Sequence, residues 1–279
     1  MHINTVRPLE GRVAWVTGSS RGLGRAIATY LAEIGAKVAI HGTSPTSTRA
    51  FNEADSLQTV ADQISADCGA EVLCVTGDLS DPLTVQHCVE AIRARFGQID
   101  ILVNNAGGDI GAAGTGAPNA GKPAINDAVD IAYDDMLTVL NRNLMTCMLC
   151  SQAVAPEMRT RRAGRIINIG SIAGTAGVPQ SAIYATAKAA VHEYTRCLAL
   201  HLRPYNVTAN VVAPGDTVTQ RFVHSRVIDE AKVLTGGTLE RYGQPIEVAR
   251  AVAFLAGEEA AFISGQVLRV DGATQTWPA

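Results

Sequence analysis

The stretch VAWVTGSSRGLG at residues 13–24 joins a short apolar run to a glycine-rich turn, and a helical pattern follows it. Gly18 allows a tight turn, Gly22 lets the backbone approach an anion, and Gly24 permits close packing of a helix. The free N–H groups at the start of that helix would face the anion. Three glycines at this spacing are more than an ordinary turn requires. Between a strand and a helix, the pattern therefore predicts a loop that binds the pyrophosphate of a dinucleotide.

The rest of the chain alternates short apolar runs with longer helical patterns, which is typical of βαβ units on a parallel sheet. The runs are rich in β-branched and other apolar residues, as expected for strands that are buried on both faces. Seven strands are expected, at residues 13–17, 37–41, 71–76, 101–104, 165–169, 208–213 and 267–270. We therefore predict an α/β protein with a single domain over residues 1–279. Its Rossmann fold would be a doubly wound, seven-stranded parallel sheet flanked by helices on both faces.

Composition narrows the possible partners. The 279 residues include 23 Lys or Arg and 26 Asp or Glu, a formal charge of −3, and 47% are hydrophobic, which is typical of a globular chain. No run of basic residues exceeds the pair Arg161-Arg162, so we expect neither nucleic acid nor a membrane as partner. The sequence shows no long apolar stretch, which predicts a cytoplasmic location. Cys147 and Cys150 form a C-x-x-C, but no second pair or nearby His completes a zinc set, so no metal is assigned.

Several motifs behind the glycine loop occur in a familiar order. The spacing T-G-x-x-x-G-x-G at residues 17–24 resembles the classical short-chain dehydrogenase/reductase family, and the likeness spans about residues 10–272. The other matching positions are N-N-A-G at residues 104–107, the active-site Asn at Asn143, Ser171, the Y-x-x-x-K pair of Tyr184 and Lys188, and Pro214-Gly215. The resemblance implies an oxidoreductase that transfers hydride between a nicotinamide dinucleotide and a carbonyl or secondary alcohol.

The chemistry of the four matching residues agrees with that expectation. Tyr184 and Lys188 lie four residues apart in an alanine-rich segment that favours a helix, so they share one helix face. A free tyrosine has a pKa near 10, but a neighbouring ammonium stabilises its phenolate. Tyr184 would therefore serve as general acid and base, with Ser171 positioning the substrate oxygen. By resemblance to the family, Asn143 and Lys188 would anchor a water relay to Tyr184.

The expected cofactor is NADP(H), with NAD(H) left open. An NAD site commonly places a carboxylate on the ribose 2′-OH about 20 residues beyond the glycine loop, where this chain has HGTS at residues 41–44. Glu53 is about ten residues farther, whereas Arg21, Thr43 and Ser44 suit a 2′-phosphate. The cofactor-binding residues implied by the resemblance are Gly18, Ser20, Arg21, Gly22, Leu23, Gly24, Gly42, Thr43, Ser44, Asp78, Leu79, Asn104, Ala106, Gly107, Tyr184, Lys188, Pro214, Gly215, Thr217 and Thr219.

Substrate loops are expected at about residues 108–132 and 216–241, after the fourth and sixth strands. The second loop carries the basic residues Arg221, His224, Arg226, Lys232 and Arg241. They favour a sugar acid, a keto acid or another polar ketone, but a solvated lid has the same composition.

Several alternatives stay open for the activity. They are an NAD(H)-dependent alcohol or polyol dehydrogenase, a 3-oxoacyl-thioester reductase, an epimerase or dehydratase of the extended branch, and a non-catalytic dinucleotide-binding protein. Residues 263–272 resemble the edge strand and turn by which family members associate, which predicts a homotetramer.

Overall fold

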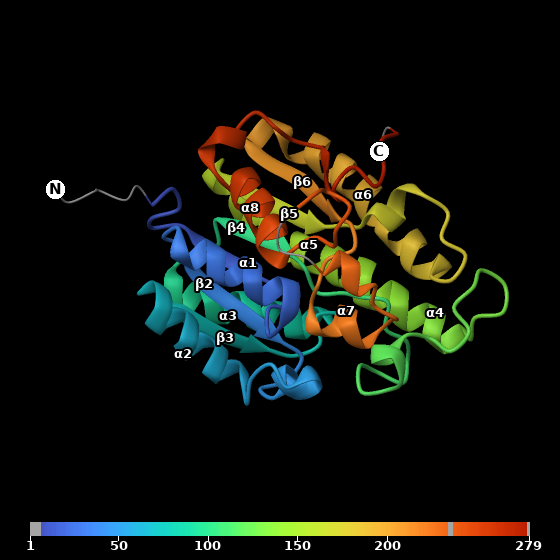
Figure 1. Ribbon diagram of the computed structural model, residues 1–279. Coiled ribbons are helices and arrows are strands. Elements are labelled where there is room, and N and C mark those ends of the chain that lie inside the picture. Colours follow the sequence, from blue (N-terminus) through green and yellow to red (C-terminus); the bar gives the residue numbers. More distant parts are fainter. Residues whose placement is uncertain (1–6, 234–236, 278–279) are drawn as a thin grey trace.

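The seven predicted strands form one parallel sheet in the computed structural model, which describes residues 7–233 and 237–277 (Figure 1). The strands are β1 (Val13–Val16), β2 (Lys37–Gly42), β3 (Val72–Thr76), β4 (Ile101–Asn104), β5 (Gly164–Ile169), β6 (Val207–Pro214) and β7 (Val267–Val270). Their order is β3-β2-β1-β4-β5-β6-β7, so the winding reverses between β1 and β4. The predicted doubly wound fold is confirmed, and ligands of such sheets bind at this reversal, beyond the carboxyl ends of the strands.

Helices cover both faces of the sheet (Figure 1). Side chains of α1, α2 and α8 pack in the core on one face, and those of α3, α5 and α6 in the core on the other. The helices are α1 (Gly22–Glu33), α2 (Leu57–Cys68), α3 (Pro82–Phe96), α4 (Tyr133–Leu140), α5 (Thr146–Arg161), α6 (Ala182–Leu202), α7 (Gln220–His224) and α8 (Pro245–Ala256). The sheet is thus buried on both faces, which explains why its strands read as continuous apolar runs.

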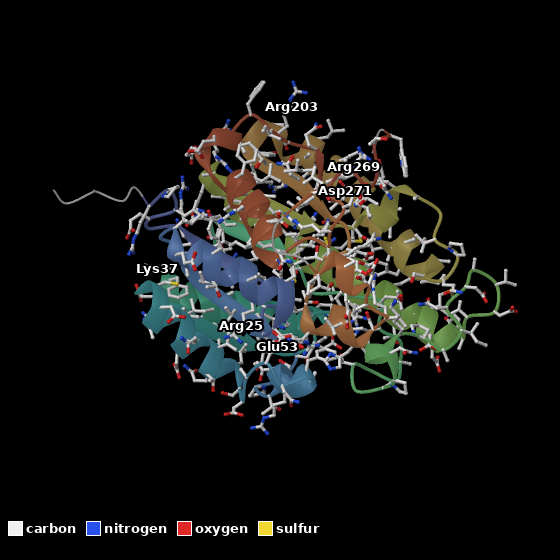
Figure 2. All side chains as sticks on the ribbon, in the orientation of Figure 1. Arg25, Lys37, Glu53, Arg203, Arg269 and Asp271 are labelled. Atoms are coloured by element: carbon white, nitrogen blue, oxygen red, sulfur yellow. The ribbon has the colours of Figure 1, made fainter. Side chains whose placement is uncertain are left out.

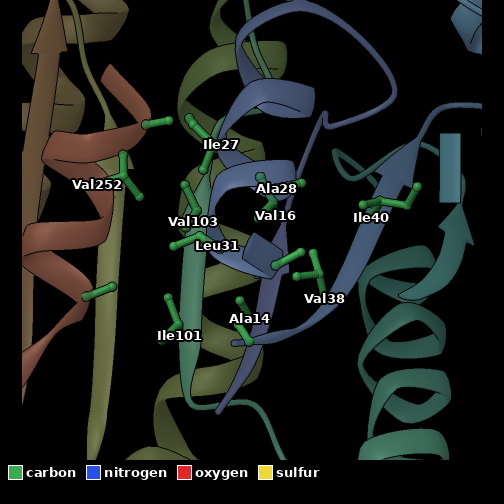
Figure 3. Close-up of a cluster of buried hydrophobic side chains, with 14 of the residues drawn as sticks. Ala14, Val16, Ile27, Ala28, Leu31, Val38, Ile40, Ile101, Val103 and Val252 are labelled. Carbon is green, nitrogen blue, oxygen red and sulfur yellow. The ribbon is translucent and has the colours of Figure 1, made fainter. Parts of the chain in front are cut away.

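The apolar face of α1 holds the glycine loop in place at the sheet. Ile27 and Leu31 of α1 are fully buried against the side chains of β1, β2 and β4, and Val252 of α8 joins the same cluster (Figure 3). Burying one such side chain contributes about 1.5–3 kcal/mol. Since Gly22 is the first residue of α1, this packing fixes the start of the helix beside the carboxyl end of β1.

Two long connections depart from the regular alternation, and both follow strands. The segment after β2 contains a short 3₁₀ turn at Ser47–Phe51, and the segment after β4 folds back so that Gly111 N–H donates to the Gly121 carbonyl. Within residues 7–233 and 237–277, no helix combines the length and apolar character needed to cross a membrane. The cytoplasmic location stays a prediction.

Candidate active site

A cavity of about 1260 Å³ opens at the carboxyl ends of the strands. The glycine loop, the ends of β2, β5 and β6, and both expected substrate loops contribute to its wall. Pockets for one small molecule usually measure about 300–1,000 Å³, so this cavity has room for a dinucleotide together with a small substrate.

The glycine loop is shaped by close backbone contacts. Gly18 has φ +62°, and a Cβ there would lie 2.8 Å from the Cα of Ala106. A Cβ on Gly24 would lie 2.3 Å from the carbonyl oxygen of Gly18. The side-chain amide of Asn105 donates to the carbonyls of Thr17 (3.0 Å) and Gly18 (2.9 Å), which ties the loop to the segment after β4. Arg21 provides no side-chain cap for α1, whose first N–H, that of Gly22, donates to the carboxylate of Glu53.

His41 clamps the glycine loop and was not singled out by sequence. Its Nδ1 accepts from Gly18 N–H at 3.1 Å, and its Nε2 lies 3.0 Å from the Gly77 carbonyl oxygen, to which it donates. Burial lowers the pKa of His41 to about 4. The neutral ring satisfies both contacts at neutral pH, because one nitrogen donates and the other accepts. The available signal was a histidine in an otherwise apolar strand directly after the first helix.

Most of the expected cofactor-binding residues lie on the cavity wall. They are Gly18, Ser20, Arg21, Gly22, Leu23, Gly24, Gly42, Thr43, Asp78, Leu79, Ala106, Gly107, Tyr184, Lys188, Pro214, Gly215, Thr217 and Thr219. Asn105, Ser47 and Arg142 also line it and were not expected.

Two expected cofactor-binding residues, Asn104 and Ser44, lie off the wall, which corrects the sequence assignment. Asn104 is the last residue of β4, and its amide donates to Ser151 Oγ (3.0 Å) and Asn168 Oδ1 (2.8 Å) inside the core. Side chains alternate along a strand, so the next residue, Asn105, faces the cavity in its place. Ser47 similarly lines the wall where Ser44 was expected.

The segment after β2 brings a carboxylate to the glycine loop. Glu53 Oε2 accepts from Gly22 N–H at 2.8 Å, and its backbone carbonyl accepts from Arg25 at 3.1 Å (Figure 2). Glu53 Oε1 is buried and has no hydrogen-bond partner among the described residues. Glu53 was not assigned to the cofactor site because it lies well beyond the position where an NAD site places its carboxylate. The 3₁₀ turn folds the chain back, so that Glu53 nevertheless reaches the glycine loop.

Arg21 lies beside this carboxylate. Its guanidinium donates to the Ser47 carbonyl and stacks on Phe51, with 5.5 Å between its Cζ and the ring centroid. Burial lowers the pKa of Arg21, and the charge of Glu53 opposes that shift. This end of the cavity therefore combines a cation with a carboxylate.

Tyr184, Lys188 and Ser171 converge on the cavity from two elements. Helix α6 carries Tyr184 and Lys188 on one face, and Lys188 Nζ lies 5.7 Å from the centroid of the Tyr184 ring. Lys188 Nζ also donates to the Ile169 carbonyl at 2.8 Å. Ser171 follows β5, and its hydroxyl accepts from Ala173 N–H at 3.1 Å, which orients it. The hydroxyl, phenol and ammonium groups thus share one wall.

Burial is the largest influence on the pKa values of Tyr184 and Lys188. It raises the pKa of Tyr184, against the opposing effects of Ser171 and of the Arg221 charge. It also lowers the pKa of Lys188 to about 8. In the chain by itself, desolvation disfavours the charged form of each group, and the effect of Lys188 on Tyr184 in the presence of a nicotinamide stays a prediction. A phenol that stays protonated at neutral pH is suited to donate a proton.

Asn143 occupies a π-helical turn, Asn141–Met145, between α4 and α5. Its side chain accepts from Gly108 N–H (2.9 Å) and donates to the carbonyls of Gly108 (2.9 Å) and Val139 (2.8 Å). It does not line the cavity, unlike Arg142 next to it. Such turns recur at functional sites. Asn143 fixes the backbone where the first substrate loop starts, and its role in a water relay stays a prediction.

The basic residues of the second substrate loop divide into two groups. Arg221 and Arg226 line the cavity, whereas His224, Lys232 and Arg241 do not. Lys232 lies 3.9 Å from Asp229 and Arg241 pairs with Glu247 at 2.6 Å, as expected for a solvated lid. Lys122, on the first loop, also lines the cavity. Lys122 is a lone lysine in a glycine-rich segment, so no sequence pattern pointed to it.

Known proteins match this chain over nearly all of its length. A family model described as short chain dehydrogenase matches residues 12–227. The 3-oxoacyl-acyl-carrier-protein reductase of Escherichia coli K12 is 38% identical over 263 residues, covering 94% of this chain and 97% of the relative. A cyclohexanol dehydrogenase of Rhodococcus sp. is 37% identical over 273 residues, covering 95% and 96%.

Solved structures agree with the fold. A putative gluconate dehydrogenase from Agrobacterium tumefaciens superimposes with a TM-score of 0.78 at 27% identity, covering 98% of this chain and 99% of that one. A levodione reductase gives a TM-score of 0.78 at 28% identity, covering 95% and 97%.

Proposed function

Since the chain belongs to the short-chain dehydrogenase/reductase family, whose members are oxidoreductases of CH–OH or carbonyl groups, we propose that it transfers hydride between NADP(H) and a carbonyl or secondary alcohol. The observation that carries this proposal is the meeting of Tyr184, Lys188 and Ser171 in the cavity that also contains the glycine loop. The glycine cradle at the start of α1 lets the backbone approach the pyrophosphate of the cofactor closely.

In the proposed mechanism, the bound nicotinamide supplies or accepts the hydride. Ser171 positions the substrate oxygen, since its hydroxyl can donate to that oxygen without changing charge. Tyr184 gives its proton to the carbonyl oxygen during reduction and takes the alcohol proton during oxidation. Lys188, when protonated, stabilises the phenolate that forms after the proton leaves Tyr184.

The NADP(H) preference is supported by Arg21 and by the hydroxyls of Thr43 and Ser47 at the same end of the cavity. Replacing Arg21 by alanine is expected to reduce the ratio of NADPH to NADH affinity about ten- to a hundredfold, because charge-assisted hydrogen bonds to a 2′-phosphate are lost. Isothermal titration with both nucleotides measures this ratio. An unchanged ratio would count against the NADP(H) assignment.

Glu53 supplies the complementary test of the preference. Glu53→Gln keeps the shape of the side chain and removes a negative charge that would repel a 2′-phosphate, so NADPH affinity should rise. A variant that instead loses affinity for NADH would show that the free carboxylate oxygen binds a ribose hydroxyl, and would assign NAD(H) as cofactor.

The identity to the acyl-carrier-protein reductase makes a 3-oxoacyl-thioester the second candidate substrate. An absorbance assay of the reduced nicotinamide, run with sugar acids, diketones and acyl thioesters, separates it from a polar ketone. Stable net oxidation of NADPH excludes an epimerase. Binding of neither nucleotide would remove the basis of the whole proposal.

We also propose a homotetramer, as the C-terminal segment led us to expect. Strand β7 is the last strand of the sheet order, and the side chains of Phe262, Leu268 and Trp277 near it are exposed. Apolar groups gathered at a sheet edge favour association with another copy. Light scattering should give four times the 29.2 kDa of one chain. A monomer mass at micromolar concentration would contradict this assembly.

A further inference from the structure

Lys122 is a half-buried ammonium on the cavity wall for which the described residues supply no carboxylate partner. Two carboxylates act on it through their charges without forming an ion pair with it. Asp216 pairs with Arg226 at 2.6 Å. Asp109 accepts hydrogen bonds from Ser181 and Asn126 at its Oδ2, each at 2.8 Å, while its Oδ1 is buried without a hydrogen-bond partner among the described residues. Burial lowers the pKa of Lys122, and the charge of Arg226 adds to that shift. Among the described residues, this cation in the cavity is therefore compensated only by carboxylates that form no ion pair with it.

Arg221 approaches the same cavity from the second substrate loop. Its Nη2 donates to the Asp109 carbonyl at 2.6 Å, while its Nε is buried and has no partner among the described residues. The guanidinium packs on Gly108, where a Cβ would lie 3.5 Å from its Cζ. Arg221 and Tyr184, the proposed proton donor, line the same cavity. Two loops that are far apart in sequence thus direct cations at one region.

Desolvated cations are unfavourable unless an anion compensates them. Two other cations of the second loop, Lys232 and Arg241, show the alternative, since each has a carboxylate partner outside the cavity. We propose that Lys122, assisted by Arg221, binds an anionic group of the substrate, so that the substrate is a carbonyl or hydroxy compound carrying a carboxylate or a phosphate. This inference rests on the proposed function, because Lys122 and Arg221 line the same cavity as Tyr184.

Matched substrate pairs test this inference on the complete enzyme. The pairs are 4-oxopentanoate with its methyl ester, and dihydroxyacetone phosphate with dihydroxyacetone, each assayed with NADPH. In the wild type, kcat/KM for the anionic member of at least one pair should exceed that of the neutral member about tenfold or more. Lys122→Met should lower this ratio about tenfold, since one charge pair in the site is lost. The preferred pair distinguishes a carboxylate from a phosphate.

Two further variants serve as controls. Lys122→Arg keeps the charge and should retain the ratio. Lys232→Met removes a lysine of the second loop that lies outside the cavity, and should also leave the ratio unchanged. An unchanged ratio in Lys122→Met, or a preference for the neutral member in both pairs, would overturn the inference.

A binding experiment separates failure of this inference from failure of the proposed function. Succinate and inorganic phosphate are titrated into the NADPH-loaded protein, which requires no turnover. At least one should bind the wild type about tenfold more tightly than it binds Lys122→Met. Equal affinities, no binding of either anion, or a weaker NADPH affinity in Lys122→Met would refute the anion site. Lack of NADPH binding in the wild type would instead refute the proposed function.

Discussion

Replacing Tyr184 by phenylalanine is expected to lower kcat about a thousandfold or more while the protein still folds and binds NADPH. The substitution removes one hydroxyl and keeps the ring that Lys188 faces at 5.7 Å. General acid catalysis contributes about a hundredfold to ten-thousandfold, and an alkoxide formed without a proton donor is poorly stabilised. Hydride transfer therefore lacks the proton transfer that accompanies it, whereas the cofactor contacts on the glycine loop are unaffected.

Steady-state kinetics and titration with NADPH measure the two effects of Tyr184→Phe separately. Tyr194→Phe is a matched control, because Tyr194 lies on the same helix α6 and does not line the cavity. The control should keep nearly the wild-type kcat. A Tyr184→Phe enzyme with more than a tenth of the wild-type kcat would show that another group donates the proton.

Replacing Lys188 by methionine should lower kcat/KM about a hundred- to a thousandfold. The side chain is buried, with 4% of its surface exposed, and its ammonium lies 5.7 Å from the centroid of the Tyr184 ring, on which the phenolate forms. A charge in a water-excluded site acts strongly on a developing anion, since no solvent screens it. Methionine fills a similar volume, so the unfolding temperature should change little relative to the loss of activity.

The pH dependence of the wild type provides an independent test of Lys188. Its pKa is lowered to about 8, so the ammonium is present below that pH and is lost as the pH rises through it. Reductive kcat/KM should hence be level near pH 7 and decline above about 8. A Lys188→Arg enzyme keeps a charge that does not titrate in this range, so its residual activity should not decline there. A wild-type profile that rises from pH 7 to 9 would contradict the role of the ammonium.

The positions of the strands and of the glycine loop could be predicted because both depend on local patterns. Apolar runs such as residues 101–104 and 208–213 can only be satisfied in strands that are covered on both faces. Gly24 is required by its contact with the Gly18 carbonyl within the turn, whereas Gly18 is required by its positive φ and by its contact with Ala106. Tyr184 and Lys188 meet because a helix brings residues four apart to the same face.

Assignments that depend on the direction of a side chain were less secure. Asn104 and Asn105 are adjacent and identical in type. The side chain of Asn104 forms hydrogen bonds with Ser151 and Asn168 in the core, whereas Asn105 faces the cavity. Only the pleat of β4 decides between them. The effect of burial on the pKa of Tyr184 could not be predicted for a related reason, since spacing shows the neighbouring charge and does not show the depth of burial.

The sequence by itself determined the elements of this protein, the glycine loop and the spacing of the reactive pair, because periodicity and backbone sterics act over a few residues. Tertiary structure alone decided which distant residues share the cavity. It brought Glu53 to Gly22 across 31 positions and Arg221 to Asp109 across 112 positions. Tertiary structure also decided which of the two loop lysines has a carboxylate partner among the described residues. Lys122 and Lys232 are both lysines of predicted substrate loops, but they differ in burial and in neighbours. Long-range packing establishes such neighbours and such desolvation, and no local pattern encodes either.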